Sequence, residues 1–453
     1  MVGVVAFIAA LIIIVPGFPI YSLTAAIPAG LTGAKKHMKG KLRNAVCDNF
    51  ELLFVMEATT NLKVFSLGAS TSIMIMANTM LLPVFPQMRK ALGLTLQEIS
   101  LMFVIVSFTA ALLNPLGGIL ADRLGRKKIV VPSIFLYGAA GGLAGAALLI
   151  LENPFRTVLF FRFLQGVGSA TPMYLAVALA GDIFQSQERT RVMGFLEIAN
   201  GLGKLISPII GGIAGLLGWY APFFVYPIIS FPVAFLFWSS IKEPQQREVS
   251  LHSELGSLSR LLSLHNILAL LASFAGILFL FGAMFWVGEF IGQKIPDGTV
   301  IHGLIVAIPV AAMMVTAYFT PAIATNIGPR VTLTAGLLIS GVSLFLIPYI
   351  YSSKLIWPNL VLIGFSAGLL LPVLDTIGSA ISSRSHRGIM TTIFGSARCL
   401  GAAAAPYIIA TLLDINIHAT FLPIAGLAVI LAFVIFFFTD EEKMLPPELK
   451  EKR

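Results

Sequence analysis

Gly118-Ile119-Leu120-Ala121-Asp122-Arg123-Leu124-Gly125-Arg126-Lys127 is the stretch of sequence that decides the fold. It lies between two long apolar segments and concentrates glycine and charge in one short link. Two membrane helices joined by so short a link need glycine where their backbones approach, and basic residues that stay in the cytoplasm. An acid such as Asp122 can also face the positive N-terminus of another helix. The stretch predicts a tight cytoplasmic turn between two membrane helices.

The composition is that of a membrane protein. Hydrophobic residues make up 57% of the chain and charged residues 11%, with a mean hydropathy of +0.92. A spanning helix needs roughly 20 apolar residues, which divides the chain after residue 60 into about twelve spans. We therefore predict an all-α integral membrane protein. The predicted spans are 64–86, 98–120, 129–151, 156–183, 190–217, 220–240, 265–291, 301–324, 331–350, 355–381, 388–412 and 419–438.

The net charge of +9 could suggest nucleic acid, but the placement of the basic residues indicates a membrane topology. If residue 60 is cytoplasmic, the only Lys and Arg in outer loops are Arg89, Lys90, Arg156, Lys294 and Lys354. Most of the others lie in cytoplasmic segments, as the positive-inside rule requires. This fixes the predicted orientation and argues against nucleic-acid binding. It also places the chain in the inner (cytoplasmic) membrane.

Residues 1–60 form an N-terminal extension with a further apolar run near 2–24. Basic residues from Lys35 to Arg43 follow the run, so it would insert with its N-terminus outside and deliver the next span in the right direction. Two alternatives remain open. The extension is an extra anchoring helix, or the true start is Met56, in which case a chain beginning there should insert, fold and transport.

A polar linker, 242–264, divides the predicted spans into two sets of six, in segments 61–241 and 265–438, with a tail at 439–453. The two halves are weak copies of each other. The segment from Pro321 to Arg330 matches Gly118 to Lys127 and keeps the second glycine, as Gly328. Further matches, all at nearly one offset, pair Gly168, Pro172, Arg189, Gly203 and Pro208 with Gly368, Pro372, Arg387, Gly401 and Pro406. Parallel six-helix repeats of this kind rock about a site at the membrane midplane.

The stretch from Gly118 to Lys127 resembles the loop between helices two and three of the major facilitator superfamily. A second motif, Arg162 to Ala170, resembles the motif whose buried arginine has been associated with proton transfer in that family. The resemblance covers about residues 60 to 440. It implies the twelve-helix fold of two six-helix halves, and it looks most like bacterial drug:proton antiporters.

The fifth predicted span carries a pattern that resembles the signature of antiporters in this family. Small residues permit close helix approach and proline kinks the helix, which suits a seam that must close the outward path. One position departs from the family, which usually has glycine where this chain has Ser207. The matching positions are Gly194, Gly203, Ser207, Pro208, Gly211 and Gly212.

The first motif implies a conformational latch at the cytoplasmic end. Asp122 would face the N-terminus of the eleventh span near Arg387-Gly388, and Arg126 would reach Asp182. These contacts would hold the outward-facing state and break when the carrier opens inward. The alternative is that the basic residues only determine the membrane topology of the chain. The latch residues are Gly118, Asp122, Arg123, Gly125, Arg126 and Asp182.

Ionisable residues inside spans are functional candidates because hydrocarbon penalises charge. Glu197 and Lys204 are seven residues apart, hence two turns apart on one face of a helix. Glu197 is the favoured proton carrier, with a static ion pair to Lys204 as the alternative. The other candidates are Arg162, Asp375, Arg398 and Asn78, the last where some drug exporters carry an acid, with Glu289 near an outer end.

Together these features predict a proton-coupled exporter of small amphipathic molecules. Its partners would be a small-molecule substrate, protons and the lipid bilayer, and we expect a monomer. No metal or cofactor is expected, since the histidines are scattered and Gly203-Lys204 lacks the upstream glycine of a phosphate loop; the chain is not expected to be an enzyme. Two alternatives are a dedicated exporter of one anionic metabolite, siderophore or lipid, and a non-transporting membrane sensor.

Overall fold

The computed structural model describes residues 58–184, 186–243, 263–294, 298–380 and 387–439. The N-terminal extension with its apolar run, most of the polar linker and the C-terminal tail lie outside the described residues. Within the described ranges every regular element is a helix and there is no strand. The prediction of an all-α protein is confirmed.

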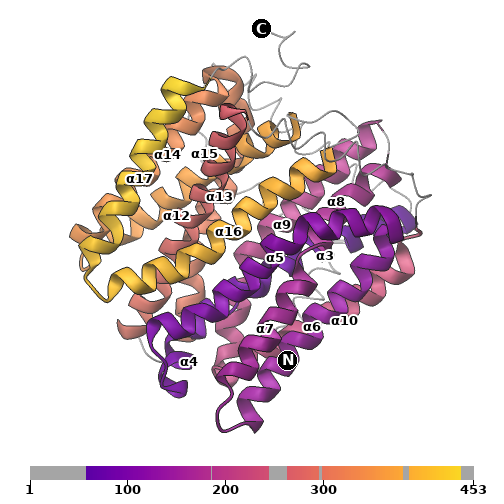
Figure 1. Ribbon diagram of the computed structural model, residues 1–453, viewed down its shortest axis with the longest axis horizontal. Coiled ribbons are helices and arrows are strands. Elements are labelled where there is room, and N and C mark those ends of the chain that lie inside the picture. The colour runs from indigo at the N-terminus through magenta and orange to yellow at the C-terminus, as the bar shows by residue number, and fades with distance from the viewer. Residues whose placement is uncertain (1–57, 185, 244–262, 295–297, 381–386, 440–453) are drawn as a thin grey trace, which may run out of the picture.

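The helices of the first half alternate in direction along the chain (Figure 1). The first span bends at a short 3₁₀ turn, because Pro83 and Pro86 interrupt it, and the fourth divides before Pro172. Proline lacks the amide hydrogen that a continuous helix needs. The elements are α3 (Ala58–Thr79), η3 (Leu82–Val84), α4 (Phe85–Leu92), α5 (Leu96–Leu124), α6 (Arg126–Ile150), α7 (Phe155–Ser169), α8 (Pro172–Ile183), α9 (Ser186–Ala214), η4 (Gly215–Leu217) and α10 (Ala221–Ser240).

The helices of the second half follow the same alternation. They are α12 (Leu264–Lys294), α13 (Thr299–Ile327), α14 (Pro329–Ile350), α15 (Ile356–Ala380), α16 (Arg387–Leu413) and α17 (Ile417–Phe438). Twelve helices of the described chain are long and apolar enough to cross a membrane, with ends within a few residues of the predicted spans. The predicted number of spans after residue 60 is confirmed.

Equivalent tight turns occur in both halves. Gly125 joins α5 to α6 with φ of +107°, and Gly328 joins α13 to α14 with φ of +90°. Residues with a side chain rarely adopt such angles, so each link needs glycine. This gives a physical reason why the repeat keeps this glycine while the charged residues around it differ.

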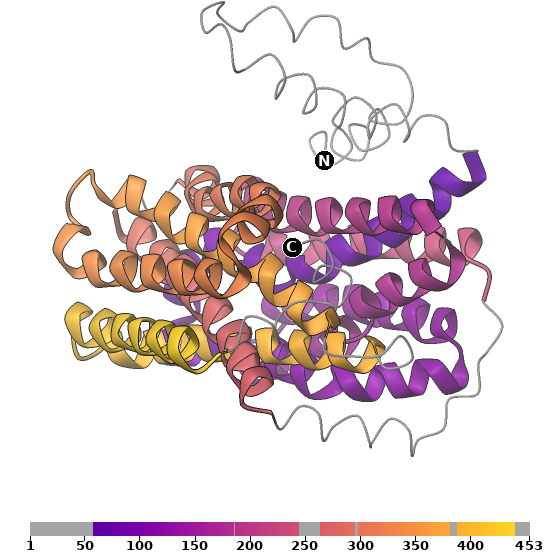
Figure 2. The same ribbon diagram turned by 90° about the horizontal axis from the view of Figure 1, so that it is seen from above.

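The two halves lie side by side, the first in indigo to magenta and the second in salmon to yellow (Figure 2). They meet mainly where α5 packs on α16 and where α9 packs on α13. Matching glycines pack alike in each half. A Cβ on Gly203 of α9 would lie 2.7 Å from the carbonyl oxygen of Ser72 on α3, and one on Gly401 of α16 would lie 2.3 Å from that of Phe274 on α12.

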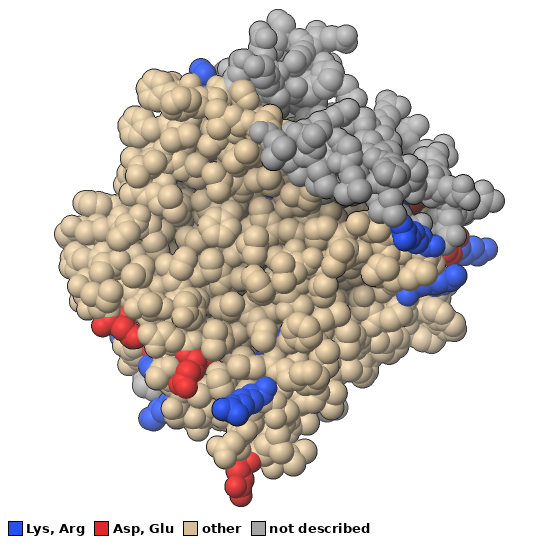
Figure 3. Space-filling view, in the orientation of Figure 1, with Lys and Arg blue, Asp and Glu red and all other residues tan. Residues whose placement is uncertain are grey.

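Charged side chains gather at two opposite ends of the molecule, with an uncharged belt between them (Figure 3). One end, which we call the basic end, carries Arg123, Arg126, Lys127 and Lys128. The opposite end, which we call the far end, carries Arg89, Lys90 and Glu289. The belt matches the apolar layer that a bilayer requires.

Candidate functional site

Four of the predicted in-span residues meet between the two halves. Glu197 and Lys204 come from α9, Asp375 from α15 and Arg398 from α16, and each of Glu197 and Lys204 interacts electrostatically with the other three groups. Arg398 Nη2 lies 2.8 Å from Asp375 Oδ1 and also donates to the carbonyl oxygen of Leu371, at 3.2 Å. We call Glu197, Lys204, Asp375 and Arg398 the central cluster.

The central cluster is open rather than packed. The Asp375 side chain is 51% exposed and Glu197 is also exposed, although each lies on a membrane-spanning helix. Lys204 forms no ion pair with any carboxylate in the part of the chain that the structure describes. The Glu197 carboxylate is therefore not locked to Lys204 and is free to bind a proton or another group.

Tyr174 on α8 belongs to the same region, and the sequence analysis did not identify it. It interacts electrostatically with Arg398, Asp375 and Glu197. A Cβ on Gly395 of α16 would lie 2.0 Å from the Tyr174 hydroxyl oxygen, so the ring packs directly against that helix. In the sequence, Gly168 and Pro172 served only as matches between the two halves, and they gave no signal for the tyrosine itself.

Arg162 and Asn78 lie apart from the central cluster in a buried polar network. Arg162 on α7 is fully buried and donates to the carbonyl oxygens of Met102, at 2.9 Å, and Ala77, at 3.0 Å. It also donates to Gln165 Oε1, at 2.6 Å, and to Asn78 Oδ1, at 2.5 Å. These hydrogen bonds hold Arg162 in place and tie α7 to α3 and α5. No described carboxylate pairs with this buried cation.

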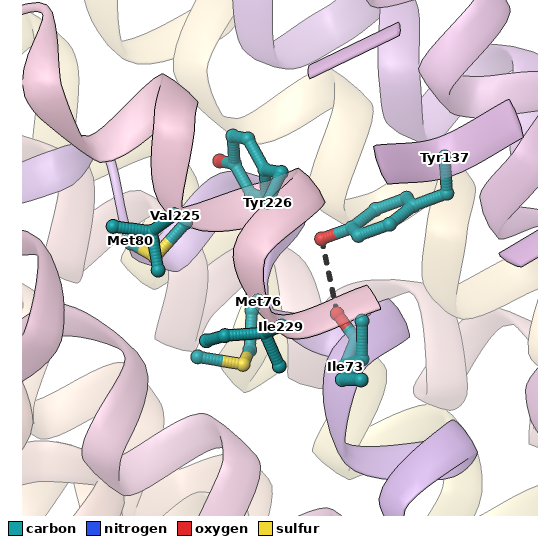
Figure 4. A pocket seen from close by; sticks show the side chains of 7 residues that line it. All are labelled: Ile73, Met76, Met80, Tyr137, Val225, Tyr226 and Ile229. Atoms are coloured by element: carbon teal, nitrogen blue, oxygen red, sulfur yellow. Dashed lines mark hydrogen bonds between the residues drawn. The ribbon is translucent and has the colours of Figure 1, made fainter. Parts of the chain in front are cut away.

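An apolar wall adjoins this network (Figure 4). Tyr137 donates from its hydroxyl to the Ile73 carbonyl oxygen, at 3.0 Å, and Tyr226 donates to that of Ala77, at 2.6 Å. The space between these rings and Met76 has no room for a water molecule. This part of the first half is packed core.

The predicted latch residues lie at the basic end of α5 and α6. Arg126 forms an ion pair with Asp182 at the end of α8. A Cβ on Gly118 would lie 3.9 Å from Thr392 Cγ2 on α16, and one on Gly125 would lie 2.9 Å from Glu243 Cδ. Arg123 is exposed. The side chains of Asp122 and Arg387 lie outside the described part of the structure.

The residues of the antiporter signature divide into two sets. On α9, Gly211 faces the Met80 carbonyl oxygen, 1.8 Å from a built Cβ, and Gly212 faces that of Thr299, at 2.4 Å. Ser207 is fully buried and accepts a hydrogen bond from Thr79 Oγ1, at 2.8 Å. Gly194 differs, because a Cβ there would meet nothing within 4 Å. From Gly203 to Gly212, the signature residues of α9 therefore pack closely against neighbouring helices, whereas Gly194 does not.

The far end is closed by contacts between the halves. Arg89 on α4 pairs with Glu289 on α12, with 2.5 Å between Nη2 and Oε1, and Gln97 donates to Asp414. Beneath them Phe85 and Phe285 are in edge contact, with ring centroids 4.8 Å apart. A Cβ on Gly303 would lie 2.3 Å from the Pro208 carbonyl oxygen. Among the described residues around Glu197, no ion pair joins the two halves.

Comparisons with known proteins agree with this architecture. A family model described as Major Facilitator Superfamily matches residues 67–301 and 300–453. The bacillibactin exporter of Bacillus subtilis is 27% identical over 84% of this chain and 97% of that protein. The class E tetracycline resistance protein of Escherichia coli is 24% identical over 70% of this chain and 78% of that protein. A crystal structure of the D-xylose-proton symporter matches with a TM-score of 0.68 at 15% identity, covering 84% of this chain and 99% of that one.

Proposed function

This chain belongs to the major facilitator superfamily, and on that premise we propose that it exports small amphipathic molecules in exchange for protons by alternating access. The observation that carries the proposal is the central cluster, in which two exposed carboxylates and two partly exposed cations lie between halves that are joined at the far end. The named relatives are an exporter and a resistance protein. The chain would act as a monomer in the cytoplasmic membrane, with the basic end in the cytoplasm.

The charge balance of the central cluster supports exchange rather than co-transport. With both acids ionised the cluster holds two negative and two positive charges, so a proton on Glu197 leaves it with a net positive charge. A cationic or hydrogen-bond-donating substrate then competes with the proton for the same carboxylate. A carrier that binds either ligand, but not both, moves them in opposite directions. Strict exchange also requires that the form with neither ligand bound changes conformation slowly.

Uptake into inverted membrane vesicles tests this function. With a proton gradient, acid inside, vesicles containing the protein should accumulate ethidium several-fold over vesicles without it, because each outgoing proton drives one substrate inward. A protonophore should abolish the difference. Absence of uptake across a panel of amphipathic cations would support the alternative of a non-transporting sensor.

A dedicated exporter of an anionic compound is the second candidate. The observation that favours it is Lys204, which lies in a span without an ion-pair partner among the described carboxylates. An unpaired ammonium inside a span can bind a carboxylate or phenolate of a ligand. Fluorescein offered in place of ethidium in the same vesicles separates the two candidates, and Lys204→Met should then abolish the fluorescein signal alone.

The register of α5 against α16 supports the proposed latch. The helices run antiparallel, with Gln97 beside Asp414, Asn114 beside Cys399 and Gly118 beside Thr392. One more turn along each helix brings residue 122 next to the first turn of α16. The N-terminus of a helix carries partial positive charge, so a carboxylate at position 122 would stabilise this contact between α5 and α16 at the basic end.

Asp122→Asn should therefore reduce transport by about tenfold or more while leaving expression and substrate binding nearly unchanged, since loss of roughly 1.4 kcal/mol changes an equilibrium tenfold. Flux in proteoliposomes and equilibrium binding in detergent measure the two quantities. Glu188→Asn, at an exposed position near the same end, is the matched control. Normal flux in Asp122→Asn would reduce the motif to a topology signal.

A further inference from the structure

A pocket of about 460 Å³ opens at the far end, between the two halves. Arg89 and Gln97 of the first half line it, and so do Trp286, Glu289 and Asp414 of the second. Its volume lies in the range of small-molecule sites, roughly 300–1,000 Å³. Because both halves build its walls, the pocket exists in this form only while the far end is closed.

Glu289 gives the pocket an incompletely satisfied carboxylate. Its side chain is only 5% exposed. Oε1 accepts from Arg89 Nη2, at 2.5 Å, and from Gln293 Nε2, at 3.1 Å, whereas Oε2 is buried with no hydrogen-bond partner among the described residues. Arg89 Nε of the same ion pair is likewise buried without a described partner. A buried carboxylate oxygen without a donor is costly, so a small shift of the pocket wall that uncovers Oε2 would let it accept a hydrogen bond from a ligand.

The charges that line the pocket favour a cation. Glu289 and Asp414 are negative and only Arg89 is positive, so the ionised lining carries a net negative charge. Two aromatic rings lie behind the lining, since Trp286 is only 3% exposed and stacks on Phe290 with centroids 5.0 Å apart. Lys294 Nζ lies 4.4 Å from the centroid of Phe290, so one cation already contacts this aromatic pair. Aromatic faces attract cations that lie within about 6 Å.

We propose that this pocket binds a small organic cation with a flat apolar part, with its donor group toward the Glu289 carboxylate and its apolar part against Leu96 and Leu413. A ligand that contacts both halves binds the closed far end better than an opened one, so it shifts the population toward the closed state. Occupancy would therefore slow export from the far side. This inference goes beyond the proposed function, because binding requires no transport.

Benzamidine is a suitable probe, since its amidinium group can donate to a carboxylate and its ring is flat and apolar. Calorimetric titration of the purified full-length chain should show saturable binding. Glu289→Gln should weaken it at least tenfold, because the amide removes the negative charge. Leu96→Trp should weaken it equally, because the larger side chain fills the pocket while leaving Arg89 and Glu289 in place.

Glu152→Gln is the matched control, an exposed acid at the same end but outside the pocket, and it should bind benzamidine as the unaltered chain does. The Leu96→Trp variant keeps the test decisive if Glu289→Gln folds poorly. Equal affinity in the unaltered chain and Leu96→Trp would overturn the proposal. Absence of saturable binding at millimolar benzamidine would overturn it too, even if the protein transports ethidium normally.

Discussion

Glu197→Gln is expected to uncouple transport without stopping it. Glutamine has the shape and neutrality of a protonated glutamate, so the carrier can still change conformation but no longer exchanges a proton for its substrate. Ethidium counterflow should persist at about the normal rate, whereas proton-driven accumulation should fall at least about tenfold. Both are measured in the same inverted vesicles, normalised to folded protein.

A static role for Glu197 predicts a different outcome. If the carboxylate served only to neutralise Lys204, Glu197→Gln would lower the yield of folded protein, and Lys204→Met would restore it. The structure argues against this role, because Lys204 forms no ion pair with any described carboxylate. Glu188→Gln, an exposed acid on the same helix, is the control. Unchanged proton-driven accumulation by Glu197→Gln would contradict Glu197 as the proton carrier and favour Asp375 in that role.

Arg162→Met is expected to destabilise the first half severely. The change removes four hydrogen bonds and leaves the Met102 carbonyl oxygen short of a donor, together with side-chain oxygens of Gln165 and Asn78. The Ala77 carbonyl oxygen keeps the Tyr226 hydroxyl. Each unpaired buried group costs about 1–3 kcal/mol, so the folded state should lose roughly 3 kcal/mol or more. Thermal unfolding of the detergent-solubilised protein, followed by size-exclusion chromatography, measures the loss.

The control for this change lies on the same helix. Arg156 of α7 is exposed, and Arg156→Met should unfold at nearly the normal temperature. Arg162→Lys should fall between the two, because an ammonium keeps the charge but cannot reproduce the planar fork of donors. Arginine does not release its proton in proteins, so its part in coupling would be to position Asn78 and the α3 backbone. Equal stability of the Arg156 and Arg162 variants would contradict this account.

The spans could be predicted from the sequence because length and apolar composition decide whether a helix crosses a bilayer. The break between α7 and α8 was not predicted, although Pro172 marks it. The mainly apolar composition of 156–183 predicted a single span and gave no sign of the local change in backbone direction. Turn glycines were predictable where the link itself required them, as at Gly125.

The candidate site was only partly predictable. A spacing of seven residues places Glu197 and Lys204 on one face of α9. This was predictable because the face that a residue occupies on a helix depends only on its spacing along that helix. The pairing of Arg398 with Asp375 and the approach of Tyr174 depend on how α8, α15 and α16 pack, which no spacing encodes. Arg89 and Glu289 are 200 residues apart in the sequence. Only their common position at the far end of the membrane could have suggested that they are in contact.

Proton movement itself tests the central claim most directly. Lightly buffered proteoliposomes would be loaded with ethidium and diluted into ethidium-free medium, while a trapped dye reports the internal pH. The account predicts that ethidium efflux acidifies the interior. Glu197→Gln should release little ethidium into this medium, and with ethidium added outside it should exchange internal for external ethidium without any pH change. Ethidium efflux from the unaltered protein with no acidification, or with alkalinisation, would contradict proton exchange.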